Sequence, residues 1–291
     1  MKSFVSFGLL AFFLLSGLLS SHVLGDVHEQ QLRLVGHSTV EGYSLKLTKE
    51  EWAWLRKKQT LVVGASPPYD APFELGSSRR INEYEGLVPD YVKLVCELLG
   101  LRAEVIHFTN REEALAALKS GRVDVFSMAR DDDAQDTALS LTRAYVDDRL
   151  VMVSRNDERL PADSNLSEKR LAMVEQYSSA EALATAYPRA NIHTYPSVQA
   201  ALAAVVFGRA DAYIGEAISA GYLIYKQYPN DVQVTELANG SFQHFSFALP
   251  SEDRRLLHLL NTALEAIPLT ERLAILRRWN AGGKGGWGNT C

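Results

Sequence analysis

The chain has 291 residues and a formal net charge of −5 at pH 7, with 47% hydrophobic and 22% charged residues. A chain with this acidic balance lacks the cationic surplus that binds phosphate backbones, so the composition argues against a nucleic-acid partner. Its two cysteines, Cys96 and Cys291, are too few for a disulfide framework, and we expect Cys96 to be a packed thiol.

Residues 1–25 predict a signal peptide. Lys2 precedes an apolar run, and a small-residue exit at residues 23–25 comes directly before Asp26. An uncleaved membrane anchor is the alternative. No later apolar run approaches the ~20 residues that a membrane helix requires. We therefore expect a mature chain without a membrane span.

The mature chain is predicted to begin with an arm and a helix over residues 26–57, followed by a strand. Thr48 precedes two glutamates, and three basic residues end the segment, which suits the dipole of a helix. The strand QTLVVGAS, residues 59–66, runs into PPYDAPFEL, where prolines keep the chain extended. Tyr69 and Phe73 then project from the strand end, either into a cleft or into ordinary packing.

One stretch of the chain occurs twice. Residues 102–127 and 189–214 align without a gap and coincide at nine positions, among them the run Ala-Leu-Ala-Ala and the motif Gly-Arg-x-Asp. Each copy has a β-branched run, a turn, an Ala/Leu helix that ends at a glycine, and a second apolar run. Glycine is favoured just past a helix because the chain there often turns left-handed. The pattern predicts two β-α-β units.

Two such units indicate two similar α/β lobes rather than one large sheet. In open α/β sheets, ligands sit beyond the carboxyl ends of the strands. If the lobes face each other, the stretches that follow Asp124 and Asp211 line a shared cleft. The alternative is that Gly-Arg-x-Asp only marks a helix stop and a strand start.

Polar residues separate the two repeats. Asp131, Asp132 and Asp133 lack the alternation and the central glycine of a calcium loop, so we expect a solvated turn or a helix cap there. DRLVMVSR, residues 148–155, predicts a strand that leaves the first lobe. QHFSFALP, residues 243–250, predicts a second crossing between the lobes.

Two segments of the second lobe carry candidate binding groups. Tyr177, Ser178 and Ser179 open a predicted helix, whose hydroxyl groups either cap it or hold an anion at its amides. Glu216 stands five residues after Asp211, where a strand ends and a helix begins. It is either a charge at a helix N-terminus or a cleft carboxylate for a ligand cation.

Catalytic and cofactor motifs are absent from the sequence. It contains no HExxH motif, no Cys/His cluster, no GxSxG elbow and no Walker loop. We therefore expect no cofactor, no metal and no enzymatic activity, although two of the many acids could still meet in the cleft as a catalytic pair.

An ordered set of short motifs resembles the family 3 periplasmic solute-binding proteins over roughly residues 58–280. The set comprises LVVG, PFE, EGLVPD, GRVDVFS, Ala144-Tyr145, GRADAYIGEA and FAL. The resemblance implies a Venus flytrap fold of class α/β, in which two lobes joined by two crossing strands close over a small solute in the periplasm. The segment LTKEEWAWLRKKQTLVVGAS further resembles the one that opens such domains in BvgS-type virulence sensor histidine kinases.

The resemblance also assigns lobes and binding roles. The first lobe would comprise approximately residues 58–153 and 246–281, and the second approximately residues 156–243, followed by a flexible Gly-rich tail at 282–291. The family's aromatic floor falls on Tyr69 and Phe73. Its ligand-facing turn in the second lobe falls on Tyr177, Ser178 and Ser179. Its acid for an α-ammonium group falls on Glu216.

One departure from the family concerns the arginine that grips the α-carboxylate in amino-acid binders. It usually precedes an Asp-Phe-Ser-x-Pro-Tyr turn, but residues 134–136 are Ala-Gln-Asp here, and Ala144 stands in place of the proline. We expect Arg130, which lies close after the strand, to replace it as a bidentate anion clamp. The expected ligand is a small polar solute, either an amino acid or a small carboxylate.

These features favour the sensor domain of a two-component system, or a truncated sensor kinase, that passes lobe closure to a kinase module. One alternative is a free binding protein that serves the permease of an amino-acid-type ABC importer. The other is a periplasmic dehydratase-like enzyme on the same fold.

Overall fold

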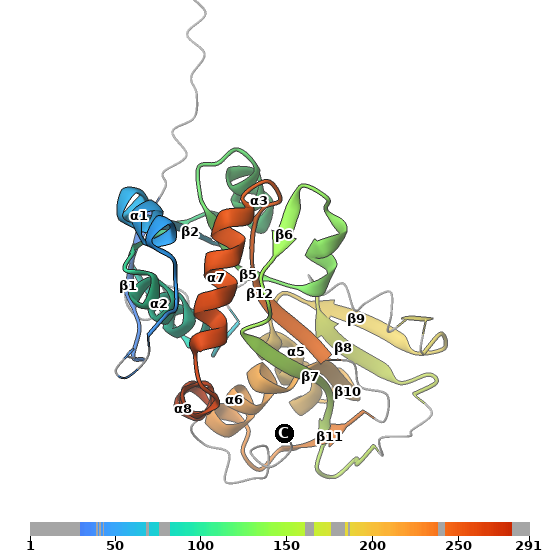
Figure 1. Cartoon of the computed structure of the whole chain (residues 1–291). Coiled ribbons are helices and arrows are strands. Elements are labelled where there is room, and N and C mark those ends of the chain that lie inside the picture. The colour runs from blue at the N-terminus through green and yellow to red at the C-terminus, as the bar shows by residue number, and fades with distance from the viewer. Residues whose placement is uncertain are drawn as a thin grey trace, which may run out of the picture.

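Two strands cross between two α/β lobes (Figure 1). The computed structural model describes residues 30–38, 40, 42, 44–67, 70–75, 82–160, 166–175, 184–185, 187–237 and 242–280. The predicted signal peptide and the Gly-rich tail lie outside these residues. Within the described ranges, no helix has the length and apolar character needed to cross a membrane.

The sheet of the first lobe is built on β2 (Thr60–Ala65). β2 pairs in parallel with β4 (Arg102–His107) on one side and with β5 (Val125–Ala129) on the other. β1 (Gln30–Val35) pairs antiparallel with β4 and parallel with β3 (Glu83–Glu85), which extends the sheet. The predicted N-terminal arm therefore contributes a strand to this lobe.

One helix of the first lobe follows its sequence signals closely, and a second is deeply buried. α1 (Lys49–Lys58) begins after Thr48, whose side chain accepts a hydrogen bond from the backbone N–H of Glu51, while the Glu51 carboxylate accepts from the Thr48 N–H. α2 (Leu87–Leu99) is buried along almost its whole length. Cys96 on α2 is buried, which confirms the packed thiol, and burial raises its pKa to about 12.

The second lobe repeats the strand order of the first. Its central strand, β8 (Arg170–Val174), pairs in parallel with β9 (Asn191–Tyr195) and with β10 (Ala212–Glu216). β11 (Val232–Glu236) lies further along the same sheet, and α6 (Ala217–Gln227) follows β10 directly. Each lobe therefore has a central strand with parallel neighbours on both sides.

The two predicted β-α-β units are confirmed. The first runs through β4, α3 (Arg111–Lys119) and β5, and the second through β9, α5 (Val198–Val206) and β10. Gly121 and Gly208 lie just past the two helices with φ of 74° and 68°. This left-handed conformation explains why a glycine ends each helix.

The aspartate of the repeated motif has the same structural role in both lobes. Asp124 Oδ2 accepts a hydrogen bond from the backbone N–H of Val62 at 2.8 Å. Asp211 Oδ2 accepts one from the N–H of Arg170 at 2.7 Å. Each carboxylate ties the start of the strand that follows it, β5 or β10, to the central strand of its lobe. The far ends of β5 and β10, not the aspartates, reach the junction between the lobes.

The lobes are joined by β7 (Val146–Arg155) and β12 (Phe242–Pro250). Residues 146–149 of β7 pair antiparallel with residues 242–245 of β12. β7 then continues into the second lobe between β10 and β11, while β12 continues into the first lobe beside β5 and β6 (Leu139–Leu141). Both predicted crossing strands are therefore confirmed.

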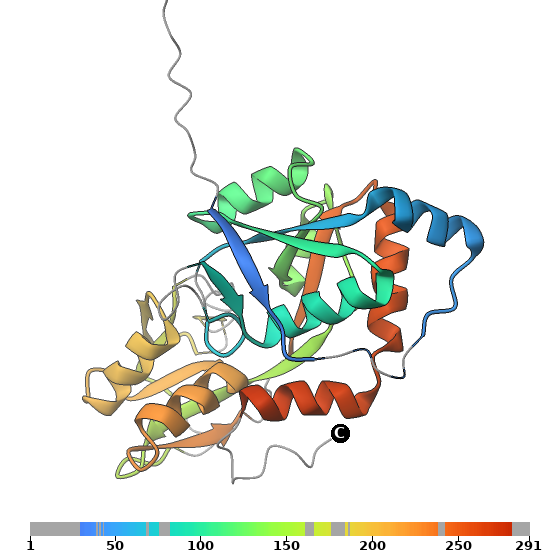
Figure 2. The same ribbon diagram turned by 90° about the vertical axis from the view of Figure 1, so that its left-hand side faces the viewer.

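Two C-terminal helices complete the fold. α7 (Arg254–Ala266) packs on the first lobe, and α8 (Leu269–Trp279) lies below α2 and ends beside α6 of the second lobe (Figure 2). Asn280, which follows α8, lies next to Gly221 on α6. The end of the C-terminal helix therefore contacts both lobes.

Asp90 in the first turn of α2 links three segments that are distant in the sequence. Its side chain is fully buried. It accepts hydrogen bonds from the N–H of His37 at 2.5 Å, from Arg278 Nη1 at 2.5 Å and from Trp279 Nε1 at 2.8 Å. The N-terminal segment, α2 and α8 therefore share one carboxylate.

Of two local expectations in the first lobe, one was wrong and one is confirmed. The segment after β2 was expected to be extended, but residues 71–73 form a turn, in which the N–H of Glu74 donates to the carbonyl of Asp70 at 3.2 Å. A short 3₁₀ helix spans Asp131–Gln135, and Asp133 caps it by accepting from the N–H of Arg130 at 2.7 Å. The expected acidic turn or cap is confirmed.

Replacing Asp90 with asparagine should lower the free energy of unfolding by about 2 kcal/mol or more, because the amide cannot pair with the Arg278 guanidinium and cannot accept all three donors. Urea unfolding at neutral pH measures the change. Asp231→Asn, at an exposed position, is the matched control and should unfold like the wild type. Equal stability of the Asp90 variant would contradict a structural role for this carboxylate.

Candidate functional site

A buried ion pair joins the two lobes. Arg130 follows β5 in the first lobe, and Glu216 is the last residue of β10 in the second. Arg130 Nη2 lies 3.4 Å from Glu216 Oε1 and 3.9 Å from Oδ2 of Asp70, which belongs to the turn after β2. The three side chains are at most 11% exposed. The carboxyl ends of the two repeated units therefore meet, as the sequence repeat predicts.

An aromatic stack supports the arginine. The Arg130 guanidinium lies 5.5 Å from the ring centroid of Phe245 on β12, within the range of a cation–π contact. Phe245 in turn packs against Phe73, with ring centroids 4.5 Å apart, and both rings are fully buried. The hinge strand β12 therefore helps to position the charged group.

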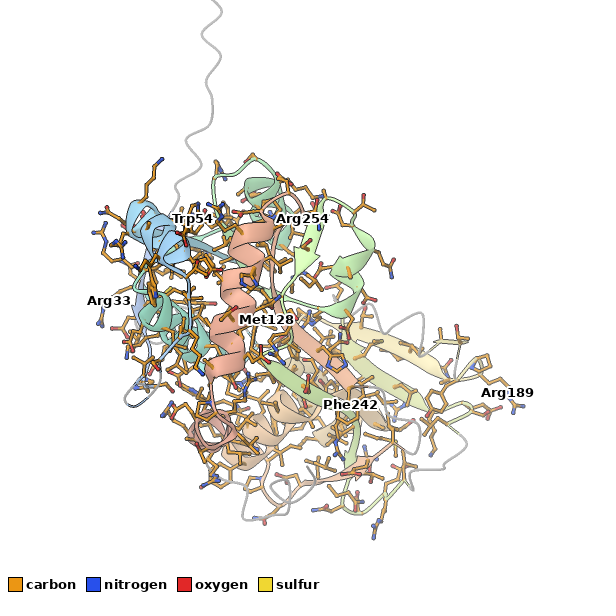
Figure 3. The ribbon with its side chains drawn as sticks, in the orientation of Figure 1. Arg33, Trp54, Met128, Arg189, Phe242 and Arg254 are labelled. Carbon is orange, nitrogen blue, oxygen red and sulfur yellow. The ribbon has the colours of Figure 1, made fainter. Side chains whose placement is uncertain are left out.

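Met128 and Phe242, labelled in Figure 3, mark where this region lies in the molecule. Met128 is on β5, two residues before Arg130, and lies near the centre of the view. Phe242 is the first residue of β12 and lies on the hinge below it.

Two further buried carboxyl groups lie near the ion pair. Glu74 accepts hydrogen bonds from the Tyr84 hydroxyl and from Ser127 Oγ, the latter at 3.0 Å. Asp148, on the hinge strand β7, accepts from the N–H of Ile218 at 3.0 Å at the start of α6. We call Asp70, Glu74, Asp148 and Glu216 the interlobe acidic cluster.

Burial makes two members of this cluster hold protons tightly. Desolvation raises the pKa of Glu74 to about 7, although hydrogen bonds from Tyr84 and Ser127 oppose the change. Desolvation raises the pKa of Asp148 from 3.8 to about 8, and the nearby Glu216 charge adds to it. Backbone hydrogen bonds to Asp148 work in the opposite direction. Near neutral pH, the cluster therefore carries less negative charge than its four carboxyl groups imply.

The structure brings together only part of the predicted site. Arg130 and Glu216 are in contact, and Phe73 lies one ring behind Arg130. Contact of these side chains with a ligand stays a prediction. The remaining predicted residues lie outside the described part of the chain: Tyr69, Tyr177, Ser178 and Ser179.

Sequence reasoning missed four residues near the ion pair. Asp70 and Glu74 lie on either side of Phe73 in the sequence. Since Phe73 was a candidate binding residue, their closeness to it could have identified them. Asp148 was included in a predicted strand only as its first residue. Tyr213 is the second residue of β10, the strand that ends at Glu216, and no pattern in the sequence shows that its hydroxyl reaches the junction. In the described ranges, no group of three or more His, Cys, Asp or Glu side chains is arranged to hold a metal ion.

Stability should fall as pH rises from about 4 to about 8, because Glu74 and Asp148 bind protons more tightly in the folded than in the unfolded chain. The stabilisation of the folded chain by these two bound protons is complete below the unfolded-state pKa near 4. It is lost as pH rises through the raised pKa values of the folded chain. Asp148→Asn should reduce the fall by an amount on the order of 3 kcal/mol, because the amide does not ionise. Urea unfolding at several pH values measures this.

The control for this comparison is Asp157→Asn, at a carboxylate whose side chain is 84% exposed. Its stability should follow the wild-type pH dependence. A pH dependence of Asp148→Asn identical to that of the wild type would show that Asp148 does not hold its proton in the folded chain.

Comparison with known proteins places these features in a family. The chain is 37% identical over 253 residues to the virulence sensor protein BvgS of Bordetella pertussis, covering 87% of this chain and 20% of that protein. It therefore spans about one fifth of the length of this relative. The crystal structure of the B. pertussis BvgS periplasmic domain matches with a TM-score of 0.80 and 37% identity, covering 87% of this chain and 49% of that one.

A single domain of the same protein matches along its whole length. The B. pertussis BvgS periplasmic VFT2 domain has a TM-score of 0.71 and 26% identity, and the match covers 81% of this chain and 99% of that domain. Residues 61–282 match the family "Bacterial extracellular solute-binding proteins, family 3". The chain has the Venus flytrap fold and belongs to this family.

Proposed function

We propose that this chain binds a small polar solute between its lobes, in the periplasm, and passes the change in lobe closure to a signalling kinase module. The family supports binding, and the similarity to BvgS supports sensing. The kinase partner is part of the proposal because the chain spans only 20% of that sensor. The segment 1–25 would serve as the signal peptide.

The ion pair between Arg130 and Glu216 is the observation that carries this proposal. It connects the two lobes directly, so opening separates a buried cation from a buried anion. A solute shifts the equilibrium between open and closed lobes only if it binds one of them more tightly. A polar solute that contacts these charges in one state and not in the other meets this condition.

A second function is supported by the family itself. Its members include extracellular solute-binding proteins, so a free carrier that delivers its solute to an ABC permease uses the same cleft. The sensor is the better supported of the two, because the match to BvgS extends over 87% of the chain at 37% identity. The matched relatives are binding and sensor domains, which argues against the dehydratase-like enzyme.

A thermal-shift screen of the purified protein against amino acids, small carboxylates and amines tests the proposal. A solute present at 100 times its Kd should add about 2.7 kcal/mol to the free energy of unfolding and raise the melting temperature. Glu216→Ala should lose the shift given by a solute with an ammonium group, and Arg130→Ala the shift given by a solute with a carboxylate, since each removes the opposite charge from the junction.

Arg143→Ala is the matched control, because it removes an arginine from an exposed ion pair with Glu265 on the first lobe. It should keep the shift produced by the solute. A shift that survives both Arg130→Ala and Glu216→Ala would place the binding site elsewhere. No shift with any compound would contradict solute binding.

A further inference from the structure

The Tyr213 side chain extends to the junction of the lobes because Gly215 has no side chain. The two residues are two apart on β10 and therefore share one face of the strand. A Cβ atom on Gly215 would lie 1.9 Å from the Tyr213 hydroxyl oxygen and 2.3 Å from its Cζ. The ring therefore runs along the strand, over Gly215, toward the end at which Glu216 stands.

The hydroxyl at the end of this ring has no hydrogen-bond partner among the described residues, although Tyr213 is fully buried. Buried polar groups in folded proteins nearly always have a partner, so an exception calls for an explanation. A hydroxyl that is hydrogen-bonded only when a ligand is bound is one such explanation.

The charges around the hydroxyl indicate what kind of ligand it meets. Those that act on Tyr213 come from Glu216, Asp70 and Asp148 and, with opposite sign, from Arg130. These groups belong to both lobes, so the hydroxyl points into the interlobe acidic cluster. Burial is the main cause of the raised pKa values of Glu74 and Asp148, and the charge of Asp70 adds to the first and that of Glu216 to the second. Such surroundings favour a positively charged ligand, and a phenol oxygen can accept a hydrogen bond from an ammonium group.

The same arrangement disfavours a ligand carboxylate. Arg130 is already in contact with Glu216 and lies near Asp70. A carboxylate from an amino acid would have to share this guanidinium with both acids. It would add a further negative charge to a buried site that is already acidic, and burying an incompletely paired charge is unfavourable.

We propose that the cleft takes a small organic ammonium ion without a carboxylate, which Glu216, Asp70 and the hydroxyl of Tyr213 bind. When the lobes open, Glu216 separates from Arg130, and the ammonium group binds beside Glu216 before they close. The inference rests on the proposed function, since it names the class of solute for the same cleft.

Isothermal titration with three matched pairs tests the absence of a carboxylate. The pairs are cadaverine with lysine, agmatine with arginine and ethanolamine with serine, and the members of each pair differ only by the α-carboxylate. At least one amine should bind ten or more times more tightly than its parent amino acid. An amino acid that binds as tightly as its amine would overturn the inference and leave solute binding intact.

Tyr213→Phe tests the hydroxyl, because it keeps the ring. The affinity for the amine should fall about tenfold, the typical effect of losing one hydrogen bond to a charged group. Without ligand, this variant should melt no lower than the wild type, since the hydroxyl has no hydrogen-bond partner to lose in the described part of the chain. Tyr225→Phe, at a side chain that is 53% exposed, is the control and should bind like the wild type.

The outcomes separate this inference from the proposed function. Unchanged amine affinity in Tyr213→Phe would overturn the role of the hydroxyl. If no amine binds but a neutral or anionic solute gives a thermal shift, the inference fails and the proposed function stands. If no solute of any class gives a shift, both fail.

Discussion

The contact between Arg130 and Glu216 is the interaction on which the relation between the lobes depends. It is buried, it spans the two lobes, and Asp70 lies close enough to share it. Removing such charges from water is costly, and their attraction recovers this cost only when the geometry is good. The ion pair therefore contributes little net stability. Its main effect is to favour one arrangement of the two lobes. Phe245 on the hinge strand restricts where the guanidinium can lie.

Parallel β-α-β units explain why charged residues meet at this place. In both lobes a central strand has parallel neighbours, and the second strand of each repeat runs toward the other lobe. Arg130 lies at the carboxyl end of this strand in the first lobe, and Glu216 lies at the carboxyl end of the corresponding strand in the second. Asp148 lies on the hinge strand and accepts hydrogen bonds from the start of α6, so the hinge and a helix of the second lobe are connected through one carboxyl group. A change at the junction therefore acts directly on the elements that must move when the lobes open.

Much of the fold was predictable because it depends on local rules. Gly121 and Gly208 each end a helix in a left-handed conformation, and this requirement is visible in the sequence as a repeated glycine. The cap formed by Thr48 and Glu51 and the two crossing strands follow from equally local patterns. The turn at residues 71–73 was missed, because prolines restrict φ without determining whether the chain turns.

By itself, the sequence determined the two repeated units, the crossing strands and the candidate residues Arg130 and Glu216 at the ends of two strands. Only the tertiary structure decided that these two residues touch, that Asp70 and Asp148 join them, and that Tyr213 extends over Gly215 to the same place. The reason is that strand ends follow from short-range periodicity and turn chemistry. Contacts between lobes depend instead on how two separately folded sheets are oriented by the strands that connect them, and no local pattern records this orientation.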